Sequence, residues 1–241
     1  MVYTVRADSI ATAWIKTVLL IDKNGVDVPT EYGNNAHTLV EPIVVHITDP
    51  TLDPKTCDEL SDFKSKAIEK YCEDFLFSGE TGHTYTYPNR LFDYPWNDDG
   101  EVCGDGNGYG YNQIEHIIDA LNDSKISRRQ IAHTWHPPSD MYMEHCPCLQ
   151  TVQFHILNNK LRLFATFRSN DMLDAALANN NGLHTLQKYV ANSLGINTGY
   201  MEIYSCNPHI YCERIDAAKK VVAGAGKYLS YQEIMNVYNQ S

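Results

Sequence analysis

The most constraining pattern in the sequence is a pair of alternating runs, residues 152–156 and 161–167, separated by Asn158 and Asn159. In both runs every second residue is apolar, which is the period of a β-strand with one buried face. Asparagine tolerates the left-handed backbone that a tight hairpin turn requires. The sequence therefore predicts an antiparallel hairpin, and any fold of this chain must cover one face of the sheet that contains it.

Helix and strand signals interleave irregularly around this hairpin. Apolar residues at helical spacing predict helices after Asp8 and Ser9 as far as Asn24-Gly25, over about 61–75, around 114–121, and over 183–194, where Gly195 can cap the end. Segments 38–47 and 200–205 are expected to be extended, and 97–110 has the composition of a loop. Because no strict βαβ rhythm appears, we expect an α+β fold with a mixed sheet, in a single domain spanning 1–241.

The charge balance restricts the partners of the chain. Its 241 residues include 19 Lys and Arg against 30 Asp and Glu, a formal net charge of -11, which argues against a broad nucleic-acid-binding surface. No apolar run approaches the roughly 18 residues of a membrane span, and the first residues show no signal-peptide pattern. Seven cysteines suit reduced thiols better than a disulfide framework. We expect a cytoplasmic protein without nucleic-acid or membrane partners, in which a few arginines can still hold a small anion.

The candidate nucleophile is Cys148, which follows Pro147 just before the hairpin. Proline keeps the backbone ahead of it out of a helix, and the entrance to a strand can leave a thiol accessible. Cationic neighbours would lower the pKa of this thiol and make it nucleophilic. Two other interpretations remain open. One is an inert buried thiol, and the other is a metal site, weakly signalled by Cys-x-Cys, that would combine Cys146 and Cys148 with His133, His136 or His145.

Two basic segments are candidates for holding a phosphate. Arg128 and Arg129 follow Ser127, and Arg168 precedes Ser169 at the end of the hairpin. Guanidinium groups and hydroxyls form charge-assisted hydrogen bonds to phosphate oxygens. For the Arg128–Arg129 pair, a solvated basic turn is the alternative.

Further polar side chains follow the hairpin. Asp171 can accept from ring or amine N–H groups, and Asn179 donates and accepts at once, which suits the carbonyl and N–H edge of a pyrimidine. Helix capping is the alternative role for Asn179. His209 and Tyr211 stand two apart on extended backbone, so both face one side. They can bind sugar hydroxyls or be ordinary surface residues.

In their order and spacing, segments from Asn112 to Tyr211 resemble the thymidylate synthase superfamily. The matching segments are Asn112-Gln113-Ile114, Ser127-Arg128-Arg129, Trp135, Pro147-Cys148, Gln153-Phe154, Arg168-Ser169 with Asp171, Asn179 and His209-Ile210-Tyr211. Upstream, Tyr85-Thr86-Tyr87 through Trp96 and Gly100 is similar to another stretch of the family, which makes Tyr87 a candidate site residue. The likeness covers somewhat over half the chain, and its short length and Pro-Cys-Leu are similar to the archaeal-type branch.

The resemblance implies a fold and a reaction. A mixed sheet flanked by helices would pack at a homodimer interface. The thiolate of Cys148 would add to carbon 6 of dUMP, and carbon 5 would then receive a methylene group and a hydride from a reduced pterin, giving dTMP without a metal. The co-substrate would be 5,10-methylenetetrahydrofolate or a tetrahydromethanopterin-type analogue, held by Asp171.

The resemblance also assigns substrate contacts. Arg168 and Ser169 would bind the phosphate together with Arg128 and Arg129 from the partner subunit. Asn179 would select uracil, and His209 and Tyr211 would bind the sugar. The catalytic glutamate is expected on the second helix, where Glu69 and Glu73 lie one turn apart.

Several positions depart from the family pattern. Residues 24–48 contain no arginine, although the phosphate loop of the family has one there. Leu149 follows the nucleophile where histidine is usual, and Phe167 stands where glutamine is usual. Residues 173–179 differ from the family segment that faces the folate, which leaves the identity of the pterin open.

Two alternative functions remain open. A dCMP or CMP hydroxymethylase of the same superfamily forms the same adduct, but water captures the methylene group. Its cytosine preference goes with an aspartate at the position of Asn179, so the asparagine favours dUMP, although the run 179–181 permits a one-residue slip in this match. A more distant alternative is a non-catalytic nucleotide- or metal-binding protein.

Overall fold

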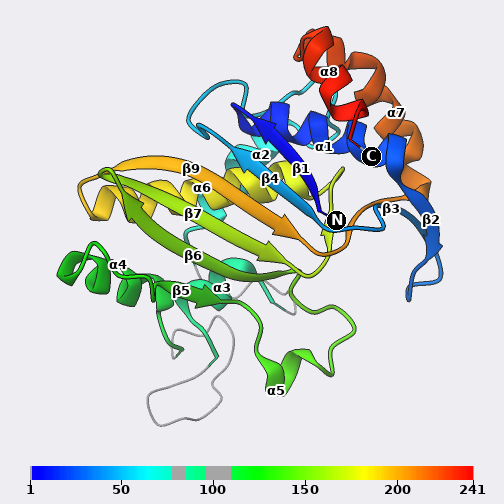
Figure 1. The fold of residues 1–241 in the computed structure, drawn as a ribbon. Coiled ribbons are helices and arrows are strands. Elements are labelled where there is room, and N and C mark those ends of the chain that lie inside the picture. The colour runs from blue at the N-terminus through cyan, green and yellow to red at the C-terminus, as the bar shows by residue number, and fades with distance from the viewer. Residues whose placement is uncertain (1, 78–84, 96–109, 241) are drawn as a thin grey trace.

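The computed structural model describes residues 2–77, 85–95 and 110–240, whose strands form two mixed sheets (Figure 1). The larger sheet has the order β1 (Tyr3–Ala7), β4 (Ile43–Ile47), β9 (Asn197–Ser205), β7 (Lys160–Phe167), β6 (Leu149–Leu157) and β5 (Ile131–His133). The smaller sheet has the order β2 (Val26–Pro29), β3 (Asn35–Thr38), β10 (Pro208–Tyr211) and β8 (Asn170–Asp171). Both sheets combine parallel and antiparallel pairs. The expectation of an α+β fold with a mixed sheet is therefore confirmed.

The predicted hairpin is present as β6 and β7. The two strands pair antiparallel down to Leu157 opposite Lys160, and the turn residues Asn158 and Asn159 have φ values of 52° and 56°. This left-handed pair is the conformation that a two-residue hairpin turn requires. Leu161, Leu163, Ala165 and Phe167 are all buried, as their alternation predicts.

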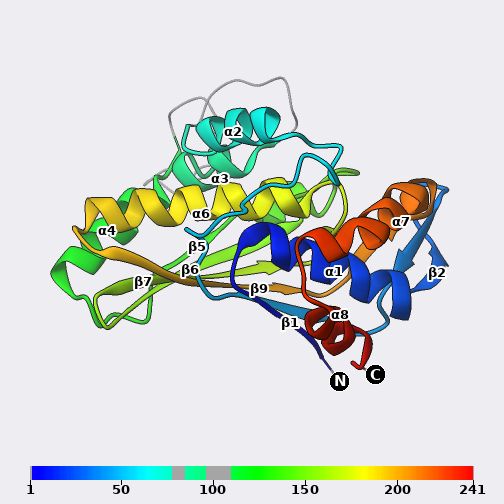
Figure 2. The same ribbon diagram turned by 90° about the horizontal axis from the view of Figure 1, so that it is seen from above.

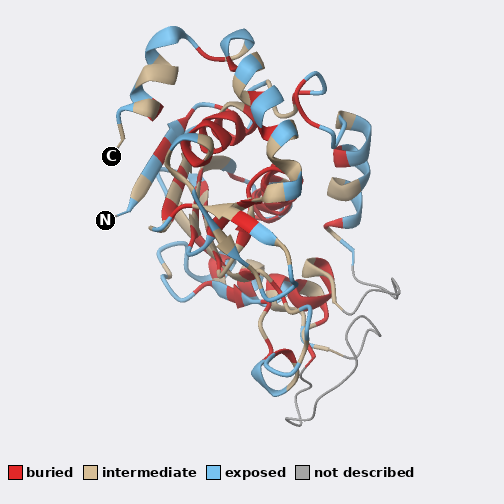
Figure 3. Ribbon diagram, turned by 90° about the vertical axis from the view of Figure 1, so that its right-hand side faces the viewer, coloured by how far each residue is buried: buried red, intermediate tan, exposed pale blue. Residues whose placement is uncertain are grey.

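Helices cover one face of the larger sheet. α1 (Ile10–Asn24), capped by the predicted Ser9, and α6 (Ala176–Ser193) lie along this face, and α2 (Ser65–Asp74) lies on the outer side of α6 (Figure 2). The buried core runs through α1, α6 and the facing strands (Figure 3). The indole N–H of Trp14 donates to the carbonyl of Leu173 at 3.1 Å, so α1 is tied to the segment that leads into α6.

The remaining helices pack around this centre. They are α3 (Tyr87–Phe92), α4 (Gln113–Asp123), α5 (Pro137–Asp140), η1 (Cys212–Arg214), α7 (Ile215–Gly224), η2 (Ala225–Lys227) and α8 (Tyr231–Tyr238). α7 and α8 contact α1, and the Lys16 ammonium lies 2.9 Å from the Glu233 carboxylate of α8. Within the described ranges, no helix combines the length and the apolar character that crossing a membrane requires.

Some expected boundaries were wrong. α6 begins at Ala176, well before the predicted residue 183, so the asparagine run 179–181 lies inside the helix. The extended segment 38–47 is divided between β3 and β4, which belong to different sheets, because Pro42 has no N–H to continue a ladder. The expected loop 97–110 lies outside the described residues except for Gly110.

Candidate active site

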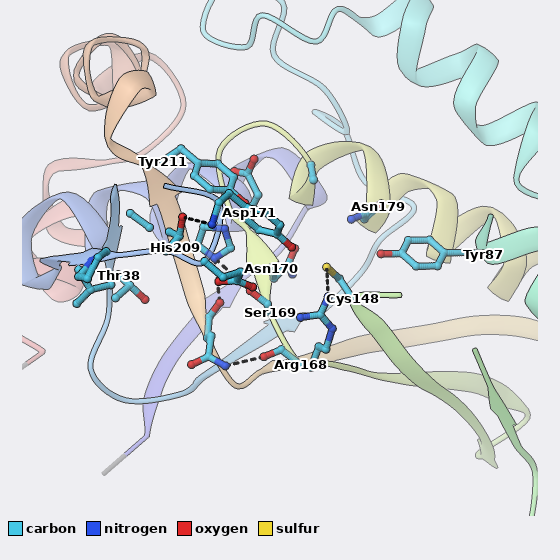
Figure 4. Close-up of a pocket in the computed structure, with 18 residues that line it drawn as sticks. Thr38, Tyr87, Cys148, Arg168, Ser169, Asn170, Asp171, Asn179, His209 and Tyr211 are labelled. Atoms are coloured by element: carbon cyan, nitrogen blue, oxygen red, sulfur yellow. Dashed lines mark hydrogen bonds between the residues drawn. The ribbon is translucent and has the colours of Figure 1, made fainter. Parts of the chain in front are cut away.

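A cavity of about 330 Å³ opens where strand ends of the two sheets meet the start of α6 (Figure 4). The hairpin of β2 and β3 contributes one of its walls. Most of the predicted site residues line it: Tyr87, Cys148, Arg168, Ser169, Asp171, Asn179, His209 and Tyr211. Because these residues come from segments far apart in the sequence, the fold itself assembles them.

The pairing of β6 with β7 brings Cys148 and Arg168 together. Leu149 is opposite Phe167 in the ladder, so the residue before β6 and the residue after β7 are neighbours, and the Arg168 N–H donates to the Cys148 carbonyl at 2.9 Å. The Arg168 Nη2 lies 3.7 Å from the Cys148 Sγ. Its Nε and Nη2 also donate to the carbonyls of Pro147 and Cys146 at 3.0 and 2.9 Å. The guanidinium therefore fixes the turn that carries the thiol.

Two opposing effects act on the Cys148 thiol. Burial raises its pKa, and the positive charge of Arg168 opposes this rise. Burial is the larger effect within a single chain, so the pKa of the thiol is raised overall, although Arg168 acts in the expected direction. The thiol is protonated at neutral pH, and Arg168 is the group that favours the thiolate once the proton leaves.

Tyr87 lies beside the nucleophile at the start of α3. Its hydroxyl oxygen accepts from the Leu149 N–H at 3.3 Å and lies on the side of the ring toward Cys148 (Figure 4). Burial raises the pKa of this hydroxyl well above its usual range. Tyr87 therefore stays protonated, and its own O–H can donate into the cavity.

Asn179 is the member of the asparagine run that lines the cavity. Asn181 points elsewhere, since its amide donates to the carbonyls of Lys55 and Leu177, and Asn180 does not line this cavity. The three successive residues point in different directions because α6 is already helical here. The geometry therefore agrees with the match to Asn179 and not with a match shifted by one residue.

The opposite wall carries a carboxylate and the residues of β10. The Asp171 Oδ1 accepts from the N–H groups of Leu173 and Asp174, both at 3.0 Å, and burial raises the pKa of this carboxyl group. The rings of His209 and Tyr211 are 4.9 Å apart at their centroids. Ser169 completes this wall, with its Oγ 3.4 Å from the His209 Nδ1.

Arg128 and Arg129 are not part of this cavity. Both are exposed, in the segment between α4 and β5, and the cavity of the same chain is lined by other residues. Arg168 is thus the single Lys or Arg among the described lining residues, which also include Glu31 and Asp171. A dianionic phosphate in this cavity would need further positive charge.

Glu69 and Glu73 also lie elsewhere. Both are exposed on α2 and line a separate cavity of about 840 Å³ with Cys72, His184 and Lys188 among its other residues. Neither carboxylate is among the groups around Cys148. Their catalytic role remains a prediction.

Sequence reasoning missed one wall of the site. Thr30, Tyr32 and Thr38 of the β2–β3 hairpin line the cavity, as do Asn170 and Asn207. Tyr32 also stacks on His145 with ring centroids 5.7 Å apart, so this hairpin contacts the segment just before Cys148. The alternation of Val26 and Val28 before Gly33-Asn34 was the available signal.

These features define the class of the site. A half-buried thiol adjoins a guanidinium, and hydroxyl, amide and carboxylate groups face the same polar cavity. Such an arrangement suits covalent catalysis by cysteine on a small anionic substrate. Among the residues that the structure describes, no three His, Cys, Asp or Glu side chains form a group that could hold a metal ion.

Comparison with known proteins agrees with this class. Residues 39–236 match the family model described as thymidylate synthase. Relatives named "Putative thymidylate synthase" include one from Methanocaldococcus jannaschii, 35% identical over 231 residues, which are 93% of this chain and 98% of that protein. Another, from Methanosarcina mazei, is 33% identical over 222 residues, with 91% and 94% covered. A third, from Methanothermobacter marburgensis, is 29% identical over 234 residues, with 92% and 99% covered. The chain therefore belongs to the thymidylate synthase family.

Proposed function

We propose that this protein is a thymidylate synthase that methylates carbon 5 of dUMP through a covalent adduct to Cys148. The observation that carries the proposal is that the Cys148 thiol, the Arg168 guanidinium and the Asn179 amide open into one cavity. They supply a nucleophile, a phosphate ligand that also favours the thiolate, and a pyrimidine-reading amide. Family membership supports the same reaction class.

In the first step the Cys148 sulfur forms a bond to carbon 6 of uracil. The electron pair of the C5–C6 double bond moves toward carbon 5 and O4, and the thiol proton is lost to solvent. Asn179 donates to O4, where negative charge develops, so it stabilises this state more than the free substrate. Carbon 5 uses this electron pair to bond to the methylene carbon of the co-substrate. The protonated hydroxyl of Tyr87 then orients a water molecule that takes the proton from carbon 5. Expulsion of the thiolate restores the double bond at the end.

The reduced pterin supplies a methylene group and then a hydride, and it leaves as a dihydropterin. Asp171 suits a pterin because its Oδ1 is held by two backbone N–H groups, while its Oδ2 makes no hydrogen bond within the described residues and can accept from a ring N–H. Thymidylate synthases use a folate-type co-substrate. Since residues 173–179 differ from the usual folate-facing segment, a tetrahydromethanopterin-type donor is the alternative to 5,10-methylenetetrahydrofolate.

The phosphate site is completed by a second copy of the chain. Within one chain, Arg168 and Ser169 face the cavity, while Arg128 and Arg129 are exposed away from it. The face of the larger sheet that α1 and α6 leave open carries the half-exposed aromatic side chains of Phe164 and Tyr200, with ring centroids 5.8 Å apart. Packing this face against its own copy forms an isologous dimer in which each subunit sends arginines to the site of the other.

An anaerobic assay of wild-type enzyme with dUMP and methylene-tetrahydrofolate, with nucleotides separated by mass, tests the proposal. Cys148→Ser is assayed beside Cys212→Ser, which changes a thiol outside the cavity. We expect dTMP from the wild type and Cys212→Ser, and none from Cys148→Ser. Equal activity of Cys148→Ser would overturn the proposal.

The same assay separates the two pyrimidine chemistries. With dCMP as substrate, a hydroxymethylated product in place of dTMP from dUMP would identify the hydroxymethylase. Asn179 argues against that outcome, since its neutral amide offers a donor to O4 of uracil. Repeating the assay with methylene-tetrahydromethanopterin identifies the one-carbon donor.

A further inference from the structure

A residue of α2 contacts the amide of Asn179 from the side away from the cavity. The Tyr71 hydroxyl donates to the Asn179 Oδ1 at 2.7 Å. Tyr71 itself does not line the cavity, whereas Asn179 does. Tyr71 therefore reaches the cavity through its hydrogen bond to Asn179.

Close packing of α2 on α6 holds Tyr71 in this position. Gly182 of α6 faces Phe75 of α2, and a Cβ atom at Gly182 would lie 2.5 Å from the Phe75 ring. Phe75 is buried, and its ring centroid lies 5.6 Å from that of Tyr71 and 6.3 Å from that of Tyr87. The two tyrosines are thus packed on one buried aromatic side chain, and the absence of a side chain at Gly182 permits the approach.

The contact determines which atom of Asn179 faces the substrate. Burial raises the pKa of the Tyr71 hydroxyl, so it keeps its proton and acts as a donor. In the structure it is the Asn179 Oδ1 that faces Tyr71 and accepts this proton. The Asn179 Nδ2 makes no hydrogen bond to any described residue and faces the space that also contains the Cys148 sulfur (Figure 4).

We propose that Tyr71 is a positioning residue that makes the site prefer uracil over cytosine by fixing the orientation of the Asn179 amide. The inference rests on the proposed function. With Nδ2 turned to the base, uracil offers an O4 acceptor, and the second lone pair of Oδ1 accepts from its N3–H. Cytosine offers an amine donor at position 4 and an unprotonated N3, so donor meets donor and acceptor meets acceptor.

The sequence predicted that α2 would bring a catalytic glutamate to the site, whereas the structure shows α2 bringing a tyrosine. Glu69 and Glu73 lie on either side of Tyr71 in the sequence, and both side chains face the separate cavity. The group that α2 brings to Asn179 is a neutral hydroxyl. A carboxylate at the same point would attract the amide N–H groups and favour the opposite orientation.

Titration calorimetry with dUMP and with dCMP, without a pterin, measures the preference separately from the chemistry. In Tyr71→Phe the ring stays and only the donor is lost, so we expect the ratio of the two Kd values to move about tenfold toward dCMP. Tyr94→Phe is the matched control, because its hydroxyl donates to the Trp135 carbonyl at 2.8 Å, away from this cavity. That variant should keep the wild-type ratio.

A double-mutant cycle with Asn179→Asp distinguishes loss of the Asn179 orientation from a general disturbance of packing around the site. A carboxylate has two equivalent oxygens and no orientation to fix, so Tyr71→Phe should leave the ratio unchanged in the Asn179→Asp background. An unchanged ratio in Tyr71→Phe alone, with dUMP still bound, would overturn the role of Tyr71 and leave the proposed function standing. A wild-type protein that binds neither nucleotide would overturn both.

Discussion

The Nη2 atom of Arg168 lies 3.7 Å from the Sγ atom of Cys148. The same guanidinium donates to the carbonyls of Cys146 and Pro147, the two residues before Cys148. One side chain thus both shapes the turn that presents the thiol and sets part of its electrostatic environment. Burial raises the pKa of Cys148 while Arg168 opposes that rise. The resting thiol is protonated, and its reactivity depends on how much positive charge surrounds it.

Replacing Arg168 with glutamine should make Cys148 less reactive. Since Arg168 lowers the thiol pKa, its loss raises that pKa further, and a rise equal to one pH unit reduces the thiolate fraction at pH 8 about tenfold. Alkylation of Cys148 by iodoacetamide, followed by mass analysis of its peptide across pH, measures this. Lys227→Gln removes an exposed positive charge outside the cavity and should leave the profile unchanged. A profile of Arg168→Gln identical to wild type would contradict the prediction.

Gly182→Ala should destabilise the protein and displace α2. The added Cβ would lie 2.5 Å from the buried Phe75 ring, and such overpacking typically costs about 1–3 kcal/mol. Urea denaturation measures the loss of unfolding free energy. Gly226→Ala is the control, since a Cβ there meets nothing within 4 Å, and it should change stability by less than about 0.5 kcal/mol. Equal stability of the two variants would argue against the close approach of α2 and α6.

The parts of the fold that the sequence predicted are those set by local pattern. The β6–β7 hairpin followed from its alternation and from Asn158-Asn159, and α1 followed from Ser9 and its apolar spacing. The start of α6 was missed because Ala175 provides no side-chain cap and the asparagines that follow resemble a helix start. These asparagines are buried instead, with 5–8% of their surface exposed. Tertiary packing decided their conformation, and no local pattern records it.

The sequence predicted several of the residues that line the cavity, but not how they are arranged in space. The order of Cys148, Arg168 and Asn179 along the chain carried the resemblance, but their proximity depends on strand pairing and on where α6 begins. The β2–β3 hairpin was missed because its strands have four residues each and only Ala36 among them is buried. The hydrogen bond between Tyr71 and Asn179 joins residues 108 positions apart. Helix and strand periodicities relate only residues a few positions apart, so they could not predict this contact.

The His184 side chain should make stability depend on pH between about 4 and 6.5. Its Nδ1 lies 3.2 Å from the Gln187 Oε1, and burial lowers its pKa from 6.5 to about 4. Because the folded state resists protonation, the stabilisation is complete above pH 6.5 and is lost as the pH falls toward 4. The difference amounts to about 3 kcal/mol. Denaturation of His184→Gln at several pH values should show a flatter dependence than wild type, while the exposed His116→Gln should not. Parallel curves for wild type and His184→Gln would contradict this assignment.

Mixing two inactive variants should restore activity if the arginines are shared between subunits. In a heterodimer of Cys148→Ser with an Arg128→Met/Arg129→Met variant, one site combines an intact thiol with intact arginines of the other subunit. The second site lacks both. Random reassortment makes about half of the dimers mixed, and each mixed dimer has one working site, so about a quarter of wild-type activity should return.

Sedimentation of differently tagged chains verifies that subunits exchange, and each variant alone under the same treatment is the control. Exchange without any return of activity would mean that Arg128 and Arg129 serve no site across the interface, and the phosphate would then depend on Arg168 and the hydroxyl groups of its own chain.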